Sequence, residues 1–321
     1  MSDLYRVHGS ENQFYLLDQT QLQAALTPEE QQQLAIELAQ REHVDGLLVV
    51  DESDSALGKM TVVNADGSLA KMCGNGLRTV ARYLSEQQHQ RDFAVTTALK
   101  DLSVAQQPDL APGVPAFAVE IAPVSFDPTA LPFTPALSET PIIDQVLPAL
   151  HPSLHFTAVA VPNPHLIAQV TREQMASPLL QTLGEQLNTS NPYFPEGVNV
   201  SFAVQLAPNE LFVRTYERGV GFTNACGTGM AATTLALSQT KADVAMNQLV
   251  SVYNPGGMVK TWVHHDDTGF WIDLIGNATV MAHATIDEDA LHRGQWRDVT
   301  IEATPEQAAY EQFVATLPRE F

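Results

Sequence analysis

The chain has 321 residues, about twice the length of a typical domain, and its 45% apolar and 17% charged residues exclude a disordered chain. Its net charge of −21, with no concentrated basic stripe, argues against DNA or RNA binding. No apolar run reaches the roughly 18 residues that span a bilayer, and the N-terminus shows no secretory signal. We therefore expect two domains, no nucleic-acid or membrane partner, and a cytoplasmic location.

The first half of the chain alternates short apolar strands with two helices. A first helix is expected after Thr27, which can cap it, with Pro28 in its first turn. A second helix is expected to run to about Gln88, because four apolar residues recur at helical spacing: Leu77, Val80, Ala81 and Leu84. Expected strands, with turn residues around them, lie at 15–18, 46–51 and 61–64.

The middle of the chain is rich in proline, and the second half then repeats the earlier order. Residues 101–150 hold nine prolines, which allow short strands such as 116–121 but no long helix. We place the domain boundary near residue 124 and expect a helix that ends near Ser238. Further strands are expected at 156–161, 198–204, 211–216, 249–253, 259–263 and 271–274. The last 40 or so residues are expected to return to the first domain.

Each half carries one of the only two cysteines, in the same short motif. Residues 70–77 (AKMCGNGL) and 223–230 (TNACGTGM) share the pattern Cys-Gly-polar-Gly between a polar loop and an apolar helix. A repeat of this kind indicates duplication and a pseudo-twofold pair of domains. A disulfide between Cys73 and Cys226 is disfavoured, since nothing directs the chain to an oxidising compartment. Two inert, buried thiols are the plain alternative to a functional pair.

The paired motif predicts a particular chemistry. Glycines beside a cysteine just before a helix let backbone N–H groups converge, which binds a carboxylate and is expected to lower the thiol pKa. Two copies facing each other across a cleft would place one sulfur on each side of an amino-acid Cα. One sulfur then removes the proton, and the other delivers a proton to the opposite face. The N–H groups stabilise the carbanion as an oxyanion hole does. The motif thus predicts an amino-acid racemase or epimerase that needs no cofactor.

Other site types fit the residues less well. A cysteine hydrolase would use His8 or His165 as base but leaves the second cysteine unexplained. A redox dithiol usually shows Cys-x-x-Cys, which is absent, and zinc would need four ligands. Residues 264–267 (HHDD) are expected to form a solvated turn, so no metal site is expected. Pyridoxal phosphate would need a lysine site, and none is evident.

With these motifs, the chain resembles the diaminopimelate epimerases, in the superfamily that includes proline racemase-like enzymes. The resemblance covers nearly the whole chain in order, and the two cysteine motifs together are highly specific. The matching segments are 8–14 (HGSENQF), 64–68 (NADGS), 73–78 (CGNGLR), 162–165 (PNPH), 197–200 (GVNV) and 217–229 (ERGVGFTNACGTG).

The resemblance implies a fold and an assembly. The fold is α+β, with two pseudo-symmetric domains, each a β-barrel-like sheet wrapped around a central helix, and the active site in the interdomain cleft. Residues 1–124 with about 278–321 would form the domain that carries Cys73, and 125–277 the domain that carries Cys226. The family also implies a homodimer and a small amino-acid substrate.

The resemblance further implies the role of each site residue. Cys73 and Cys226 would be the acid and base pair. The reacting carboxylate would be held by backbone amides of Gly74, Asn75, Gly227 and Thr228. The residues near the reacting amine would be Asn12, His165 and Glu217, and those that fix the distal amino-acid end would be Asn64, Asn163, Asn199 and Arg218.

Several departures from the family pattern bear on the substrate. Glu11 and Gln13 flank Asn12, Pro162 replaces a glycine, and 276–278 (GNA) replaces a Gly-Pro-Ala-like segment. LL- to meso-diaminopimelate conversion is the leading expectation, because arginine suits a distal planar carboxylate. The alternatives are a racemase of another amino acid such as histidine, a non-catalytic or isomerase member of the superfamily, and a thiol redox protein.

Overall fold

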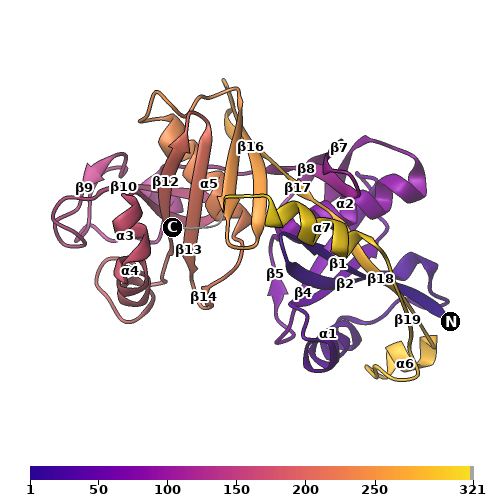
Figure 1. Ribbon diagram of the computed structural model, residues 1–321. Helices are drawn as coiled ribbons and strands as arrows, with labels where there is room; N and C mark the ends of the chain where they lie inside the picture. The colour runs from indigo at the N-terminus through magenta and orange to yellow at the C-terminus, as the bar shows by residue number, and fades with distance from the viewer. Residues whose placement is uncertain (319–321) are drawn as a thin grey trace. The chain divides into compact units, whose positions relative to one another are not determined.

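The computed structural model describes residues 1–318, which form two compact units (Figure 1). The first unit comprises Met1–Val119 and Ile275–Thr316, and the second comprises Glu120–Leu274 together with residues 317–318. The divisions fall within two strands, β8 (Val114–Ile121) and β17 (Gly269–Asn277). Residues 319–321 of the expected first domain lie outside the described residues.

The first unit contains most of the N-terminal strands and the last elements of the chain. Its further strands are β1 (Ser2–Gly9), β2 (Asn12–Asp18), β3 (Gly46–Asp51), β4 (Gly58–Asn64), β5 (Leu69–Ala70), β6 (Asp92–Thr96), β7 (Asp101–Ala111), β18 (Thr279–Ile286) and β19 (Thr300–Ala303). Its helices are α1 (Pro28–Glu42), α2 (Gly74–Gln88), α6 (Glu288–His292) and α7 (Glu306–Ala315), with a 3-10 turn at Gln19–Gln21. β18 pairs antiparallel with β1, so the segment Ile275–Thr316 completes this unit.

The second unit has its own set of strands and helices. Its strands are β9 (Gln145–Val146), β10 (His155–Val161), β11 (Asn163–Gln169), β12 (Asn199–Ala207), β13 (Glu210–Glu217), β14 (Gly221–Phe222), β15 (Leu249–Asn254) and β16 (Gly257–Asp266). Its helices are α3 (Arg172–Ala176), α4 (Leu179–Asn188) and α5 (Gly227–Ser238), with a 3-10 turn at Pro128–Ala130.

The two units share one strand-pairing scheme. In the first, β2 runs parallel to β3, β4 runs antiparallel to β3 and β5, and β6 runs parallel to β4. In the second, β11 runs parallel to β12, β13 runs antiparallel to β12 and β14, and β15 runs parallel to β13. The predicted α+β fold with two similar domains is therefore confirmed.

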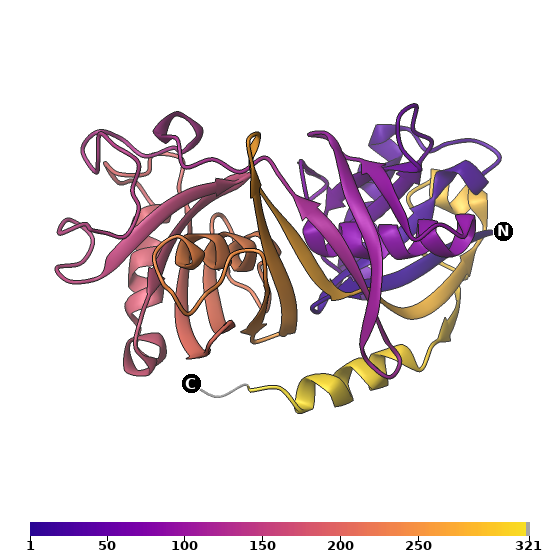
Figure 2. The same cartoon turned by 90° about the horizontal axis from the view of Figure 1, so that it is seen from above.

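A buried helix occupies the middle of each unit. α2 packs against β1, β2, β3, β4 and β7, and α5 against β10, β11, β12, β13, β15 and β16. Figure 2 shows each of these helices among the strands of its own unit. α5 consists almost entirely of small and apolar residues on every side, and a helix of this composition is stable only when it is surrounded by protein.

Local sequence explains how the first helix begins. Thr27 caps α1: its hydroxyl accepts from the Glu30 backbone N–H at 3.2 Å, and the Glu30 carboxylate accepts from the Thr27 backbone N–H at 2.7 Å. Leu34, Ala35 and Leu38 of α1 are fully buried in the core of the first unit, as their spacing predicts.

Some elements differ from the sequence-based expectations. β7 is a long strand that continues past Pro108, where its register with β8 shifts, because proline has no N–H to donate to the ladder. β11 begins at Asn163 and includes Pro164, which precedes its first parallel partner pair with β12, so the proline interrupts no bond of that ladder. In the HHDD segment both histidines belong to β16, and the turn begins at Asp267. α3 and α4 were not expected.

None of the helices in residues 1–318 is long and apolar enough to cross a membrane.

Candidate active site

Each cysteine is the N-cap residue of the central helix in its unit. Cys73 precedes α2 with φ −143° and ψ 102°, and Cys226 precedes α5 with φ −113° and ψ 100°. These extended backbone angles let the chain turn from a loop into the helix at the cysteine itself. Each sulfur therefore lies at the end of a helix where N–H groups have no intrahelical partner.

In the first unit, three predicted site residues come together around one amide oxygen. The Cys73 thiol donates to Asn12 Oδ1 at 3.6 Å, and Asn75 Nδ2 donates to the same oxygen at 3.3 Å. The sulfur also accepts from the Gly76 backbone N–H at 3.4 Å. The structure thus brings together Cys73, Asn12 and Asn75, with Cys73 held as a thiol donor.

Asp45, which the sequence did not single out, fixes the orientation of Asn12. Its carboxylate Oδ2 accepts from Asn12 Nδ2 and from the Gln13 backbone N–H, both at 2.7 Å. The amide nitrogen of Asn12 is therefore committed to Asp45, and its carbonyl oxygen faces Cys73. The signal that could have found Asp45 is its place just before β3, which runs parallel to β2 from the strand end where Asn12 lies.

Asn64 lies at the end of β4, but its side chain serves its own turn. Asn64 pairs with Gly46 on β3, and its Nδ2 donates to Ser68 Oγ at 2.9 Å. The side chain is half-buried. The structure thus joins Asn64 to Ser68 rather than to Cys73 or Asn12.

In the second unit, a carboxylate approaches the cysteine. Glu217, at the end of β13, is a hydrogen-bond partner of the Cys226 thiol and accepts a short hydrogen bond from the Thr223 hydroxyl. Cys226 Sγ also lies 3.7 Å from Thr228 Oγ1. Cys226, Glu217 and Thr228 therefore form one cluster, in which Cys226 is buried, with 7% of the residue exposed.

A buried histidine joins Asn163 to the cluster around Cys226. His165 is fully buried, and its Nε2 lies 3.1 Å from both Asn163 Oδ1 and Thr228 Oγ1. Its neighbour across the parallel ladder is Asn199, whose Oδ1 accepts from the Arg218 backbone N–H at 2.8 Å.

Arg218 occupies the outer edge of this group. Its side chain is exposed, and Nη1 donates to the Glu196 carbonyl at 3.3 Å. Of the expected residues in the second unit, Arg218 is thus the one whose side chain is turned toward solvent. Its backbone, rather than its guanidinium, makes the contact with Asn199.

The second glycine of each motif lies so close to a neighbouring strand that an added side chain would displace its neighbours. A Cβ at Gly76 would lie 2.8 Å from Leu48 Cδ2 on β3, and a Cβ at Gly229 would lie 2.7 Å from Thr215 Oγ1 on β13. The Cys-Gly-polar-Gly pattern therefore lets the first turn of each helix pack directly onto a strand.

Burial dominates the proton affinities of the site, so the expectation of lowered thiol pKa values is wrong for this structure. Burial raises the pKa of Cys73, and the Gly76 N–H and the Arg78 charge oppose it only in part. Burial raises the pKa of Cys226 well above its usual value, and the Glu217 carboxylate adds to this. The helix end stabilises a thiolate, but removal from water costs more.

The groups around Cys226 are shifted by burial as well. Burial raises the pKa of the Glu217 carboxyl, while hydrogen bonds from Thr223 and Cys226 act in the opposite direction. Burial and the Arg218 charge lower the pKa of His165 to about 3, so this imidazole is neutral near pH 7. His165 can therefore take part in hydrogen bonds there but carries no charge.

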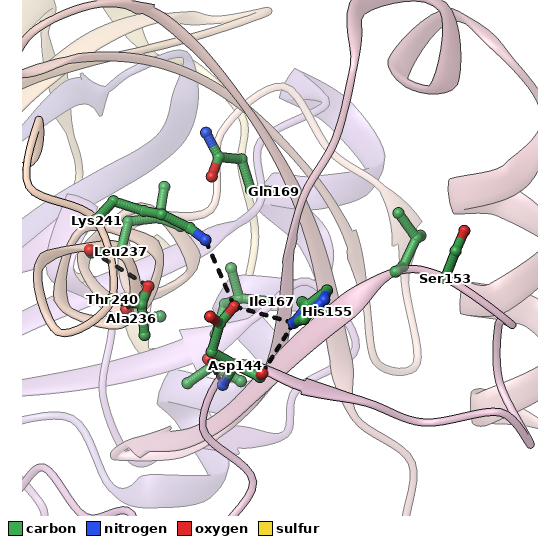
Figure 3. A pocket seen from close by; sticks show the side chains of 11 residues that line it. Asp144, Ser153, His155, Ile167, Gln169, Ala236, Leu237, Thr240 and Lys241 are labelled. Atoms are coloured by element: carbon green, nitrogen blue, oxygen red, sulfur yellow. Dashed lines mark hydrogen bonds and ion pairs between the residues drawn. The ribbon is translucent and has the colours of Figure 1, made fainter.

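A pocket of about 160 Å³ lies elsewhere in the second unit, near the C-terminal end of α5. Figure 3 shows Asp144 between His155 and Lys241. Asp144 Oδ1 lies 3.5 Å from His155 Nδ1 and 3.6 Å from Lys241 Nζ. None of the predicted site residues lines this pocket. Within residues 1–318, no group of three or more His, Cys, Asp or Glu side chains is placed to hold a metal ion.

Solved structures define the class of fold to which this arrangement belongs. A Bacillus anthracis phenazine biosynthesis protein of the PhzF family matches with a TM-score of 0.64 at 14% identity, over 88% of this chain and 97% of that one. A probable proline racemase from Agrobacterium radiobacter K84 matches with a TM-score of 0.58 at 12% identity, over 99% and 100%. The chain thus has the two-domain fold of the PhzF and proline racemase-like proteins.

Sequence comparisons narrow the class to one family. The family model described as diaminopimelate epimerase matches residues 4–111 and 157–281. A diaminopimelate epimerase of Lactiplantibacillus plantarum is 52% identical over 98% of both chains, and one of Enterococcus faecalis is 48% identical over 98% of both. The chain belongs to the diaminopimelate epimerase family, as its motifs predicted, and is an isomerase that acts on a small molecule.

Proposed function

We propose that the protein converts LL- to meso-diaminopimelate by inverting one Cα without a cofactor, with Cys73 and Cys226 as the acid and base. The observation that carries the proposal is that each cysteine caps the central helix at the same place in two units that share a strand-pairing scheme. The curated relatives that share about half of its sequence are diaminopimelate epimerases, which supports this substrate.

In this proposal the two helix ends hold the reacting carboxylate in the cleft between the domains. Backbone N–H groups of Gly74 and Asn75 would donate to it from α2, and those of Gly227 and Thr228 from α5. A carboxylate at a helix end is favoured by both the free N–H groups and the helix dipole. The same donors stabilise the carbanion, because its charge spreads into the carboxylate.

Proton transfer then follows from the placement of the sulfurs on opposite faces of Cα. The thiolate on one face takes the Cα proton, and the thiol on the other face gives its proton to the carbanion. One C–H bond breaks and one forms, so the proton count is unchanged and the two sulfurs exchange protonation states. Asn12, His165 and Glu217 are proposed to lie near the reacting amine, where ionised Glu217 would attract an ammonium group.

The distal end of the substrate would be recognised by a second group of residues. We assign this role to Asn64, Asn163, Asn199 and Arg218. A guanidinium suits a carboxylate because it can donate two parallel hydrogen bonds. The asparagine side chains offer both donors and acceptors, which a distal centre that carries an ammonium and a carboxylate requires.

Deuterium uptake tests the reaction and the substrate together. Purified, reduced protein is incubated in deuterated water with LL-diaminopimelate, L-histidine and a panel of other L-amino acids. We expect deuterium at Cα of inverted diaminopimelate and none in histidine. Inversion of histidine with diaminopimelate untouched would replace the substrate assignment, and absence of Cα exchange in every compound would contradict an epimerase.

The remaining assignments are proposals with simple tests. We propose that no cofactor is used, so activity should survive dialysis against a chelator and treatment with a carbonyl reagent. We also propose a cytoplasmic homodimer whose domains comprise 1–124 with about 278–321, and 125–277. Light scattering of the purified protein and cell fractionation test the assembly and the location. A monomer at enzyme-assay concentrations, or activity lost to the chelator, would overturn the corresponding proposal.

A further inference from the structure

Arg78 is a buried cation that the proposed reaction does not yet use. It lies on α2, about one and a half turns after Cys73, and is 0% exposed. Its Nε donates to the Asn277 carbonyl at 3.0 Å, and its Nη2 donates to Ser10 Oγ at 3.3 Å. Its Nη1 has no hydrogen-bond partner within residues 1–318. The hydrogen-bond acceptors of this guanidinium are thus neutral.

The guanidinium packs beside the first turn of α2. A Cβ built on Gly9 would lie 2.6 Å from Arg78 Nη2 and 2.9 Å from the Asn75 carbonyl oxygen. Gly9 therefore touches both the arginine and the helix turn that carries the carboxylate-binding amides. Because Gly9 has no side chain, the Arg78 guanidinium fits beside it.

Arg82 on the same helix is an arginine whose charge is paired with carboxylates. Its Nη1 lies 2.6 Å from Glu306 Oε2, and its Nε lies 2.7 Å from Glu86 Oε1. Among residues 1–318, no carboxylate is a hydrogen-bond partner of Arg78, although Arg78 is the more buried of the two. Burial of a cation without a counter-charge is strongly unfavourable unless an anion forms nearby.

The charged and titratable groups around Cys73 and Arg78 limit where that anion can form. Arg78 lowers the pKa of the Cys73 thiol, and Asp45 raises it. His8 is neutral near pH 7, because burial lowers its pKa to about 4, and Tyr310 is the other group that faces the arginine. Burial lowers the pKa of Arg78 to about 10, so it still carries its charge at neutral pH.

We propose that Arg78 is a positioning residue whose fixed, buried charge stabilises the thiolate of Cys73 and so equips this cysteine to act as the base. The consequence of the Arg78 charge for catalysis rests on the proposed function, whereas its effect on the Cys73 thiol does not. The equivalent place five residues after Cys226 is occupied by Ala231, so only the first motif has this cation.

Alkylation of Cys73 tests this effect directly, because the chain has only two cysteines. In a Cys226→Ala background, the rate of reaction with iodoacetamide is measured against pH to give the midpoint for thiolate formation. We expect Arg78→Gln to raise the midpoint by about one pH unit or more, which slows alkylation about tenfold at a pH below both midpoints. Arg78→Lys, which keeps the charge, should restore most of the rate.

Arg82→Gln is the matched control, since it removes a charge from the same helix that is already paired. Its midpoint should equal that of the unaltered background. An unchanged midpoint in folded Arg78→Gln would overturn the proposal, as would an equal rise in Arg82→Gln. If Arg78→Gln does not fold, Arg78→Met replaces it, and failure of both charge-free variants to fold would show a structural role and also overturn the proposal.

Enzyme kinetics separate this inference from the proposed function. With both cysteines present, Arg78→Gln should lower kcat about tenfold near pH 7, and activity should recover as pH rises through the new midpoint. A loss that stays constant with pH would contradict a role through the thiolate. Turnover in Cys73→Ala would contradict the two-cysteine reaction, but it would not change the conclusion drawn from alkylation.

Discussion

The two cysteine motifs share their backbone geometry but differ in the charges around the sulfur. Asn64 lies nine residues before Cys73, and Glu217 lies nine residues before Cys226. The Cys73 thiol donates to a neutral amide oxygen, whereas the Cys226 thiol is the hydrogen-bond partner of a carboxylate. A buried arginine follows only the first motif.

This difference indicates that the two similar units have different roles in proton transfer. The shared fold provides two equivalent helix ends, and the different residues around them make the two sulfurs unequal. A carboxylate disfavours a thiolate at Cys226, and a nearby cation favours one at Cys73. We therefore expect Cys73 to be the base and Cys226 the acid when LL-diaminopimelate binds to the resting enzyme.

The largest expected effect is the loss of either sulfur. Cys73→Ala and Cys226→Ala should each lower the rate of inversion by at least about 100-fold, because each removes one of two required proton carriers. The rate of conversion of LL-diaminopimelate measures this, with circular dichroism to check folding. Near-normal turnover in one folded variant would show that the reaction needs a single cysteine.

The paired glycines should respond unequally to the same substitution. Gly229→Ala places a methyl group against Thr215 Oγ1, which is buried and lies 2.9 Å from Ser201 Oγ, so we expect a loss of about 2 kcal/mol in the free energy of unfolding. Gly76→Ala instead meets the flexible end of Leu48, which can move aside, so we expect a smaller loss; alanine's higher helix propensity offsets part of the cost equally at both positions. Urea unfolding of both variants compares them, and an equal or larger loss at Gly76 would contradict this account.

The carboxylate beside Cys226 can be neutralised to test why the two cysteines differ in their tendency to form a thiolate. In a Cys73→Ala background, Glu217→Gln should speed the alkylation of Cys226 about tenfold near neutral pH, because it removes the charge that opposes the thiolate. Thr223→Val, which alters the neighbour of Glu217 without removing its charge, is the control. No acceleration in Glu217→Gln would mean that the Glu217 charge does not contribute to the difference between the two thiols.

The last expected effect concerns the pH dependence of stability and His8, the buried histidine of the first unit. Its folded-state pKa of about 4 lies below the unfolded value of 6.5, so the unfolded state binds more protons below pH 6.5. Its contribution to stability is complete above pH 6.5 and is lost as pH falls toward 4, at up to about 1.4 kcal/mol per pH unit. His8→Asn should flatten this slope in urea unfolding, and parallel slopes for the two proteins would refute the assignment.

The sequence predicted the framework of the site better than its electrostatics. Residues 46–51 and the helix that ends at Gln88 were predictable, because apolar runs and helical spacing report burial directly. β11 was missed because Pro162 and Pro164 are typical of loops, and only the pairing with two neighbouring strands shows that the second proline is tolerated.

The partners of the site residues were the hardest to predict. Asp45 and Asn277 act through contacts with residues far away in the sequence, which no local pattern reveals. The raised thiol pKa values were missed because the benefit of a helix end can be read from the motif, whereas the cost of burial depends on the packing of the whole unit. Arg78 did carry a signal, since a charged residue adjoins the apolar face of a helix.

The central claim, that both sulfurs reach one small substrate, is tested most directly by a short cross-linker. Reduced protein is treated with a dihaloacetone, which joins two thiols through three carbons, and its peptides are analysed by mass spectrometry. The account predicts one linker per chain, joining the peptides of Cys73 and Cys226, with cross-linking prevented by diaminopimelate. Two separately alkylated cysteines with no bridged peptide would contradict it.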